Sequence, residues 1–479
     1  MEDKEKILLP EGFENMVRDV IGDSEWNAFV EALADEPSVS IRLNSKITDN
    51  RLQITDSTSL LTPHSSFLTV KWCEHGRYLS ERPKFTYDPL FHAGAYYVQE
   101  ASSMFVWQAL SLLVEQDALV LDLCAAPGGK STAIAQYLSE NGFLVSNEYV
   151  PQRAHVLVEN ITKWGAPNCV VTNNAPRHFE KLKTRFDAIL VDAPCSGEGM
   201  FRKDERAREE WSPANVEMCV ERQREILESA WKVLKPGGVL IYSTCTFNSH
   251  ENEEQVQWLI DEMEAEYLPL KIEEDWMITE TERGYRFLPH KTRGEGLFMA
   301  AVRKQCTMHN AQCTIDAIYC VSDKKKQNKK DRNRKDKTLV QTQIASLQLS
   351  TLNLPEGFDV IESENKFYAV QKDRMALVDE CRKCLNVLMF GVQMYEQKGK
   401  DLIPQTALAL SQVYKRGAYP EVELSYEEAI AFLRKEAIVL ADAPRGFVLV
   451  TYKGLPLGWV KNIGNRCNNL YPEFWRIRN

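Results

Sequence analysis

The sequence has none of the features that mark an exported or membrane protein. Its charged N-terminus, residues 1–6, is not followed by an apolar stretch of signal-peptide length. No uninterrupted apolar run approaches the roughly 18 residues that a membrane helix needs. The 12 cysteines lack the spacing of a disulfide framework, so we expect reduced thiols. These absences predict a cytoplasmic protein with no membrane partner.

Neither composition nor length indicates an unusual class of protein. Hydrophobic residues make up 44% of the chain and charged residues 26%, which is ordinary for a soluble globular protein. The 479 residues exceed what one hydrophobic core usually supports, so we expect about two to four domains. We find no internal repeat.

Positive charge is concentrated in one segment of an otherwise acidic chain. The formal net charge is −10, yet residues 324–337 hold nine Lys or Arg against two Asp, a local charge of +7, so the remainder carries −17. Contact with a polyanion depends on such local patches rather than on net charge. We interpret the segment either as a solvated tether or as a contact with RNA, and both can hold.

The first 115 residues predict a mixed N-terminal extension. Residues 24–34 have the pattern of a short helix with Ser24 as its N-cap. Residues 38–44 have the pattern of a strand. A mostly helical segment is expected over 94–113, because apolar and small side chains recur there at helical spacing.

Short apolar runs alternate with amphipathic stretches from Ala118 to about Lys304. The runs are 119–123, 143–146, 169–171, 188–191 and 239–242. The stretches between most of them, such as 150–164 and 216–234, have the length of helices. This order predicts an α/β fold, with a parallel sheet covered by helices on both faces and ligands at the carboxyl ends of the strands.

The alternation stops after Lys304, and residues 340–479 are predicted to form a separate region beyond a basic linker. This region contains short β-like runs such as 446–452. Its tail, 458–466, mixes aromatic and basic residues.

A glycine-containing loop, 122–130, follows the first predicted strand and opens a helix. Glycines let the backbone approach a ligand, and the free N–H groups at a helix start favour a carboxylate or phosphate. The spacing matches neither G-x-G-x-x-G nor the P-loop G-x-x-x-x-G-K. The loop therefore favours a small, amino-acid-like ligand over a dinucleotide or ATP, with a purely structural turn as the alternative.

Glu148 ends the second predicted strand. An acid at this position can accept hydrogen bonds from ribose hydroxyls, as in other nucleotide-binding sheets. The alternative is a solvated surface acid.

Two cysteines, Cys195 and Cys245, lie 50 residues apart, each just after a predicted buried strand. Asp192 ends the first of these strands. A lone cysteine is often a small buried hydrophobe. Two thiols at the same edge of a sheet instead indicate nucleophilic chemistry on an electrophilic ring.

A cytosine ring fits this chemistry. Its C5 is too poor a nucleophile to take a methyl group unaided, but a thiolate added at C6 makes the ring enamine-like, so that C5 can attack a sulfonium methyl. Because a free thiol has a pKa of about 8.5, positive charge or helix termini must favour the thiolate. Asp192 is expected to favour protonation at N3, and a second acid/base group assists loss of the C5 proton.

The same motifs carry a family resemblance. Over roughly residues 10–304 the chain resembles the Sun family, also called NSUN or Fmu, of RNA (cytosine-5)-methyltransferases. The matching segments are 41–44, 98–104, 124–130, 192–199, 243–246 and 286–298. The remainder, ending in the Pro-Leu-Gly-Trp of 456–459, resembles the PUA-like RNA-binding region of the bacterial small-subunit rRNA branch.

The resemblance implies a Rossmann-like methyltransferase core with S-adenosylmethionine as cofactor. It makes Cys245 the nucleophile and Cys195 the group that assists product release. It also places Asp192 near the methyl donor and Glu148 on the ribose. The implied cofactor loop consists of Cys124, Ala125, Ala126, Pro127, Gly128, Gly129 and Lys130. The presence of both thiols favours RNA over DNA.

One position departs from the family pattern. The acid that usually meets the adenine after the third strand is Ala175 here, which leaves Asn174 or the backbone alone to replace it.

Four other features are given no catalytic role. Cys381 and Cys384 form a lone C-x-x-C, so no metal is expected. His250 is interpreted as a cap or surface residue. Trp211 and the pair 202–203 are interpreted either as RNA contacts or as ordinary packing and solvation.

The predicted function is methylation of C5 of a cytosine in RNA, with 16S (small-subunit) rRNA preferred, through a covalent Cys–C6 adduct. A tRNA methyltransferase and a non-catalytic RNA-binding assembly factor are the alternatives. The expected parts are an N-terminal α+β extension (1–115), a Rossmann-like catalytic domain (116–305), a basic linker (306–339) and a C-terminal α+β RNA-binding region with a PUA-like domain (340–479). We expect a monomer that binds no DNA.

Overall fold

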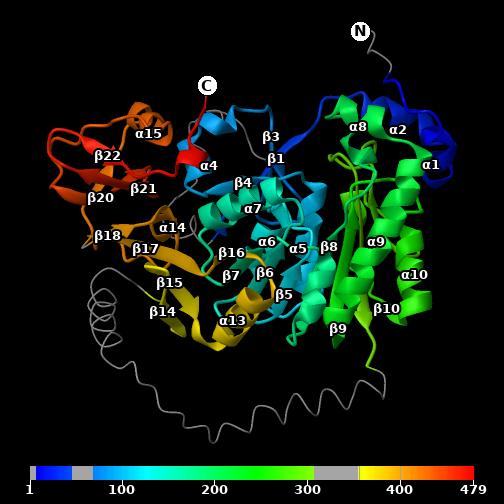
Figure 1. Cartoon of the computed structure of the whole chain (residues 1–479). Helices are drawn as coiled ribbons and strands as arrows, with labels where there is room; N and C mark the ends of the chain where they lie inside the picture. Colours follow the sequence, from blue (N-terminus) through cyan, green and yellow to red (C-terminus); the bar gives the residue numbers. More distant parts are fainter. Residues whose placement is uncertain (1–6, 46–67, 307–353, 355, 400, 479) are drawn as a thin grey trace, which may run out of the picture.

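The computed structural model describes residues 7–45, 68–306, 354, 356–399 and 401–478 (Figure 1). The basic segment 324–337 lies outside the described residues, as does the expected linker apart from Cys306. Within the described part of the chain, no helix is long and apolar enough to cross a bilayer.

The centre of the molecule is a ten-stranded mixed sheet with the order β11-β12-β13-β9-β8-β5-β6-β7-β16, in which β10 also pairs with β13. Its parallel strands are β5 (Leu119–Asp122), β6 (Phe143–Asn147), β7 (Cys169–Thr172), β8 (Phe186–Asp192) and β9 (Leu234–Thr244). Antiparallel strands β10 (Ala265–Tyr267), β11 (Thr279–Thr281), β12 (Gly284–Phe287) and β13 (Leu297–Lys304) extend it beyond β9. Each of the five predicted apolar runs falls on one of the parallel strands, so the predicted α/β class is confirmed.

Helices cover both faces of this sheet. One face packs against α5 (Val106–Leu113), α6 (Gly129–Tyr137) and α7 (Pro151–Trp164), and the other packs against α9 (Pro213–Val233) and α10 (Glu253–Met263). Successive side chains of a strand point to opposite faces, so Val120 and Leu121 of β5 enter different cores. The chain reverses its winding direction between β5 and β8, which is where doubly wound sheets bind ligands.

Among the described residues, the N-terminal extension has a small antiparallel sheet with the order β2-β3-β1-β4, two helices before this sheet, and the short helix α4 (Pro89–His92) between β3 and β4. Its elements are α1 (Phe13–Ile21), α2 (Trp26–Leu33), β1 (Val39–Leu43), β2 (Leu68–Thr69), β3 (Gly76–Leu79) and β4 (Tyr96–Val98). The strand predicted over 38–44 is confirmed as β1.

Two N-terminal expectations are wrong. Ser24 is not a helix cap, because the Trp26 N–H already donates to the Gly22 carbonyl at 3.1 Å and α2 begins only at Trp26. The segment 94–113 begins with a strand, since β4 pairs antiparallel with β1. Helical structure begins only at the 3₁₀ turn η2 (Ser102–Phe105) and continues in α5. Residues of β4 form a strand despite their helical spacing, because they pair with β1.

The C-terminal region contains two further four-stranded sheets. The first consists of β14 (Phe358–Ser363), β15 (Lys366–Gln371), β17 (Val392–Lys398) and β18 (Asp401–Pro404). The second consists of β19 (Glu421–Glu423), β20 (Gly446–Tyr452), β21 (Leu455–Asn462) and β22 (Cys467–Asn469). The helices of this region are α13 (Met375–Cys384), α14 (Thr406–Leu410) and α15 (Tyr426–Leu433). The predicted run 446–452 is confirmed as β20.

One strand of the C-terminal region belongs to the central sheet. β16 (Val387–Phe390) pairs antiparallel with β7, and Cys381 and Phe390 are buried in the same core as α9 and α10. One strand of the expected C-terminal region is therefore part of the central sheet. The physical reason is that β7 would otherwise end the sheet with unpaired backbone N–H and C=O groups, which β16 satisfies.

A buried arginine joins the N-terminal extension to the core. Arg42 of β1 is 0% exposed and donates to Gln99 Oε1 at 2.8 Å, to Thr132 Oγ1 at 2.5 Å and to Gln136 Oε1. Its guanidinium lies 4.5 Å from the ring centroid of Trp164. Burial lowers the pKa of Arg42 to about 10. Since Thr132 and Gln136 belong to α6, this one side chain ties β1 to the helix that follows the loop 122–130.

Replacing Arg42 with Met should destabilise the fold. The variant leaves several buried acceptors unpaired, and each of them costs about 1–3 kcal/mol. The matched control is Arg303→Met, which removes an exposed ion pair with Glu266 and should cost at most about 1 kcal/mol. Urea denaturation of both variants measures the difference. Equal midpoints would contradict the role given to Arg42.

Candidate active site

The two thiols meet at the carboxyl edge of the sheet. β8 and β9 are parallel neighbours with Asp192 opposite Ser243, so the loops that follow them leave the sheet side by side. The sulfur atoms of Cys195 and Cys245 lie 3.3 Å apart, and the Cys245 N–H donates to the Cys195 sulfur at 3.4 Å. Both residues are partly exposed. One bound ring can therefore meet both sulfur atoms.

The surroundings of the pair favour a protonated Cys195. The hydrogen bond with Cys245, followed by burial, raises the pKa of the Cys195 thiol well above its usual range. The negative charge of Glu251 acts in the same direction. Cys195 is thus suited to donate its S–H to a neighbouring thiolate.

An ion pair between the buried Lys130 and the partly exposed Asp192 lies beside the thiols. Lys130 Nζ lies 2.7 Å from Asp192 Oδ1, and the Ser243 hydroxyl donates to the same oxygen at 2.7 Å. Burial opposes the charge on Lys130, but Asp192 outweighs it and raises the pKa of the ammonium, and Cys245 acts in the same sense. The ammonium therefore stays positive beside the two thiols.

The loop 122–130 is held in place by α7. Arg153 donates to the Ala126 carbonyl at 2.7 Å, and Asn160 donates to the Pro127 carbonyl at 2.8 Å. Gly128 has a φ of 117°, a conformation that residues with a side chain rarely adopt. The first turn of α6 has backbone N–H groups without an intrahelical partner. This loop can therefore receive an anionic group of a ligand.

Asp122, the last residue of β5, has one buried oxygen without a partner. The Ser131 hydroxyl donates to Oδ2 at 2.6 Å, whereas Oδ1 has no hydrogen-bond partner among the described residues. Burial is the main cause that raises the pKa of this carboxyl to about 7, and the charges of Asp192 and Glu148 add to the shift. An unpaired buried acceptor is costly, and a donor on a ligand would satisfy it.

Glu148 follows β6 and is 4% exposed, which excludes the alternative of a solvated surface acid. Its Oε1 accepts the Val150 N–H at 2.8 Å, and its Oε2 lies 3.7 Å from Arg153 Nη1. Its charge acts on Asp122 and Cys124, so it lies close to the loop. Burial raises the pKa of the Cys124 thiol well above its usual range, which makes this third cysteine of the site a poor nucleophile.

The Asn174 side chain is not available as an adenine partner. Its Oδ1 accepts the backbone N–H of Asn386 at 3.1 Å, and its Nδ2 donates to the Asn386 carbonyl at 3.3 Å. The Asn173 N–H donates to the same carbonyl at 2.9 Å. The side chain therefore binds the residue before β16, and only the backbone around Ala175 remains for the role of the missing acid.

Two buried carboxylates beside the thiols were not among the residues predicted from the sequence. Glu198 and Glu251 are both 0% exposed, and each binds backbone N–H groups of a cysteine loop. Glu251 lies in the acid-rich stretch 251–254, where nothing in the pattern separates it from its more exposed neighbours. For Glu198, the available signal is its position three residues after Cys195.

Packing rather than RNA contact explains Trp211 and Arg202. Trp211 is 4% exposed and donates to Glu198 Oε1 at 3.1 Å. The Arg202 side chain is buried 3.6 Å from Glu295. His250 is a surface residue that contacts Glu254 at 2.9 Å, as expected. Within the described ranges, no group of side chains has the composition of a metal site.

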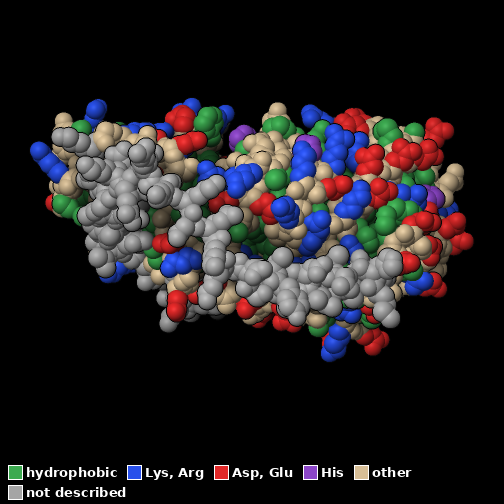
Figure 2. Space-filling view, turned by 60° about the horizontal axis from the view of Figure 1, so that its bottom comes forward, with side chains coloured by type: hydrophobic (Ala, Val, Ile, Leu, Met, Phe, Trp, Pro, Cys, Tyr) green, Lys and Arg blue, Asp and Glu red, His purple; other side chains and the backbone are tan. Residues whose placement is uncertain are grey.

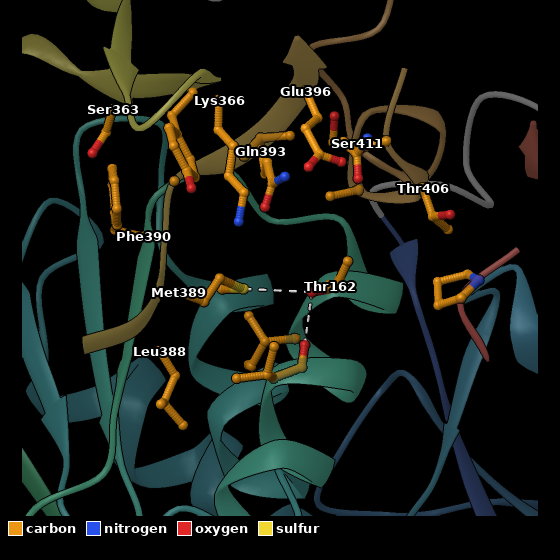
Figure 3. Close-up of a pocket in the computed structure, with 18 of the residues that line it drawn as sticks. Thr162, Ser363, Lys366, Leu388, Met389, Phe390, Gln393, Glu396, Thr406 and Ser411 are labelled. Atoms are coloured by element: carbon orange, nitrogen blue, oxygen red, sulfur yellow. Dashed lines mark hydrogen bonds between the residues drawn. The ribbon is translucent and has the colours of Figure 1, made fainter. Parts of the chain in front are cut away.

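A cavity of about 860 Å³ lies elsewhere, between α7 and the C-terminal region (Figure 3). Lys366 and Glu396 line it from the side of β15 and β17. Thr162 lines it from α7, where its hydroxyl lies 3.4 Å from the sulfur of Met389. The lining contains neither thiol of the pair and mixes charges of both signs. We therefore place the candidate reaction at the sheet edge.

Comparison with known proteins indicates one family along the chain. The family described as 16S rRNA methyltransferase RsmB/F matches residues 109–303. The N-terminal domain of 16S rRNA methyltransferase RsmF matches residues 9–101, and the methyltransferase RsmF PUA domain matches residues 419–477.

Two relatives resemble the chain over nearly its whole length. Ribosomal RNA small subunit methyltransferase F of Shewanella sp. (strain ANA-3) is 32% identical over 462 residues, 93% of this chain and 92% of that protein. The protein of the same name from Klebsiella pneumoniae (strain 342) is 32% identical over 480 residues, 98% of this chain and 96% of that protein.

Solved structures show the same fold for the core. A methyltransferase homolog protein from Pyrococcus horikoshii matches with a TM-score of 0.50 at 29% identity, over 58% of this chain and 90% of that one. NSun6 from Pyrococcus horikoshii, solved with SFG, matches in fold with a TM-score of 0.53 at 23% identity, over 62% of this chain and 99% of that one. The Rossmann-like core with a C-terminal PUA-like region is confirmed, as is the resemblance to the small-subunit rRNA branch.

The raised pKa of Asp122 predicts a loss of stability with rising pH. The pKa of Asp122 in the folded state, about 7, lies above its unfolded value of about 3.9, so the folded state binds more protons between these two values. The free energy of unfolding therefore falls as the pH rises through this range. Asp122→Asn removes this ionisation. The unfolding free energy of the wild type should therefore fall relative to the variant from about pH 4 to about pH 8, by at most about 4 kcal/mol. Urea denaturation across that range measures it, and a difference that rises with pH would contradict the shift.

Proposed function

Since the chain belongs to the 16S rRNA methyltransferase RsmB/F family, we propose that it methylates C5 of a cytosine in small-subunit rRNA with S-adenosylmethionine as the donor. The observation that carries the C5 chemistry is the pair of sulfur atoms 3.3 Å apart at the sheet edge. Methyl transfer to a ring nitrogen or a hydroxyl needs no thiol, whereas C5 becomes nucleophilic only after a sulfur has added to C6.

Cys245 is the proposed nucleophile. Its thiolate forms a bond to C6 while the ring electrons move toward N3. Asp192 hydrogen-bonds the N3 edge and favours proton uptake there. C5 then takes the methyl group, and loss of the C5 proton to a base restores the C5–C6 double bond as the Cys245 sulfur leaves. Cys195, held protonated 3.3 Å away, assists this release.

The residues around 122–130 fit S-adenosylmethionine, which when bound supplies an electrophilic methyl group on a sulfonium. Glu148 is suited to the ribose hydroxyls, and the N–H groups at the start of α6 are suited to the carboxylate. The unpaired Oδ1 of Asp122 suits a donor such as the ammonium group.

Charge on the surface supports an RNA partner. Figure 2 shows Lys and Arg side chains gathered over the middle of one face, whereas Asp and Glu side chains gather toward one end. Such local patches bind a polyanion even in a chain with a net charge of −10. The part matched by the RsmF PUA domain supplies a second RNA-binding element in this proposal. We also propose that the chain divides into the parts 1–115, 116–305, 306–339 and 340–479. The further proposals are that the protein is a monomer, lies in the cytoplasm and binds no DNA.

The rival functions are methylation of tRNA and a non-catalytic role in ribosome assembly. An assembly factor needs neither thiol nor Asp192, so their arrangement favours an enzyme. Methyl transfer to purified 16S rRNA and to tRNA, followed by bisulfite mapping of the product, tests the proposal. Transfer to tRNA alone, or to neither RNA, would overturn it.

The two thiols should differ when each is removed. Cys245→Ala should abolish methylation and form no covalent RNA complex, because no sulfur remains to attack C6. Cys195→Ala should methylate slowly at most and accumulate a covalent enzyme–RNA adduct, because Cys245 still adds while release is impaired. Denaturing gels with RNA and S-adenosylmethionine show the adduct as a shifted band.

The matched control for loss of a thiol is Cys384→Ala, in α13 of the C-terminal region, which should behave as the wild type. An adduct in Cys245→Ala but not in Cys195→Ala would reverse the assignment of the two cysteines. Full activity of both variants without an adduct would exclude the mechanism.

Glu148→Ala should weaken cofactor binding and leave the fold intact. Loss of a charge-assisted hydrogen bond to the ribose costs roughly 1.5–3 kcal/mol, or about 10- to 150-fold in affinity. Calorimetry with S-adenosylmethionine measures this change. The control is Glu159→Ala, which removes an acid of α7 that pairs with Lys163. Unchanged affinity in Glu148→Ala would remove Glu148 from the site.

A further inference from the structure

Two carboxylates lie beneath the thiol pair, fully buried and held by neutral donors. Glu198 and Glu251 are both 0% exposed. Over the described ranges of the chain, neither forms an ion pair with a Lys, Arg or His side chain, and their contacts come from backbone, amide and indole N–H groups. Burying a charge in this way is costly. Such a cost points to a role in the arrangement of the site.

Glu198 holds the loop that carries the other thiol. It follows Cys195 by three residues, yet its Oε2 accepts the backbone N–H groups of Phe247 at 2.6 Å and Asn248 at 3.0 Å. Its Oε1 accepts a hydrogen bond from the Asn248 side chain at 2.9 Å. These contacts fix the loop that begins at Cys245.

Glu251 makes the reciprocal contact. It follows Cys245 by six residues, and its Oε2 accepts the backbone N–H of Ser196 at 3.0 Å and Nε2 of Gln223 at 2.8 Å. Its Oε1 accepts the side-chain amide of Asn248 at 2.8 Å. Since Ser196 is the neighbour of Cys195, each loop carries the carboxylate that fixes the other loop.

The donors around the two residues require an acceptor at both side-chain oxygens, which an amide does not offer. A carboxylate accepts hydrogen bonds at both oxygens, whereas Gln presents an N–H₂ group at one end. Burial raises the pKa of Glu251 above its usual value, the charge of Glu198 adds to the rise, and the hydrogen bonds from Ser196 and Asn248 offset only part of it. A Gln at either position has the same shape but turns one acceptor into a donor that faces other donors, so the contacts of one of the two side-chain oxygens are lost. We call the contacts that Glu198 and Glu251 make with the two cysteine loops the brace.

We propose that Glu198 and Glu251 are positioning residues for methyl transfer. The two carboxylates lock the cysteine loops against each other and so hold the sulfur atoms at their 3.3 Å spacing. This rests on the function proposed above, in which Cys245 forms the adduct and Cys195 assists its release. Loosening the brace separates the two thiols and leaves the cofactor loop in place.

The spacing can be measured without RNA or cofactor, by oxidising the full-length protein with diamide. Two adjacent thiols lose two hydrogens to diamide, which is reduced to its hydrazine, and one disulfide forms. Peptide mass spectrometry follows the Cys195–Cys245 link. This rate is divided by the rate at which iodoacetamide alkylates the same thiols, because removal of a nearby negative charge also changes the thiolate fraction.

In Glu198→Gln and Glu251→Gln we expect the ratio of the two rates to fall by about 10- to 150-fold, as for a lost charge-assisted hydrogen bond. Glu254→Gln is the matched control, because Glu254 is half-exposed and contacts Ser249 and His250. Gln223→Met changes the size little but removes the Nε2 group that donates to Glu251 Oε2 at 2.8 Å and to the Pro194 carbonyl at 3.1 Å, and it should lower the ratio by about 2- to 12-fold. If a Glu variant does not fold, this milder variant supplies the test, because an unchanged ratio would contradict the proposal.

Kinetics supply the second readout. In the Gln variants kcat for methyl transfer should fall by about 10- to 150-fold, while the Kd of S-adenosylmethionine changes by less than about threefold. A wild-type ratio and kcat in folded variants would overturn the proposal. Equal losses of kcat and cofactor affinity would also overturn it, because they indicate a general structural defect. A lowered ratio in a protein whose wild type methylates no RNA would support the brace and reject the proposed function.

Discussion

The parallel pairing of β8 with β9 is the constraint on which the candidate site depends. Because both strands run in the same direction with Asp192 opposite Ser243, the two cysteine loops leave the same edge of the sheet and residues 50 positions apart meet. β5 lies on the other side of β8, which brings the loop 122–130 and Lys130 to Asp192. β13 pairs with β9 from the far side and fixes its position. A shift of one residue in the register of β9 against β8 would turn the side chains of β9 to the opposite face of the sheet, and the residues of the site would no longer meet.

Buried charge marks the places where separate parts of the chain meet at this site. Arg42 joins the N-terminal extension to α6, Lys130 joins the loop 122–130 to β8, and Glu198 and Glu251 join the two cysteine loops. Each of these groups is expensive to bury, and each is satisfied by partners that are distant in the sequence. Few arrangements of the backbone can satisfy them all at once. We interpret these groups as selecting the geometry of the site more than adding to the stability of the fold.

The features that could be predicted from the sequence are those with a local signal. The apolar run 239–242 marks a buried strand by itself, and Cys245 lies at its end whatever the rest of the chain does. β4 and β16 have no such signal, because each becomes a strand only by pairing with β1 or β7. Burial of Glu198 and Glu251 likewise depends on the loop opposite, so their composition alone suggests surface acids. The sequence offered Asn174 as a ligand contact, but both ends of its side-chain amide are hydrogen-bonded to the backbone of Asn386, 212 residues away.

The Asn174–Asn386 contact has a mechanical consequence for catalysis. Asn147 Nδ2 donates to the Asn174 carbonyl at 2.9 Å, and the Asn174 N–H donates to Asn147 Oδ1 at 3.0 Å. Hydrogen bonds thus connect the residue before β16 to Asn147, which ends β6 and directly precedes the proposed ribose acid, Glu148. Arg42 ties the N-terminal extension to α6 in the same manner. With both flanking regions fastened to the strand edge, closure of one part over another has little freedom to bring a target base to the thiols. In the function proposed above, the RNA therefore supplies most of the movement, by turning the target base out of its helix into a site whose parts are already in place.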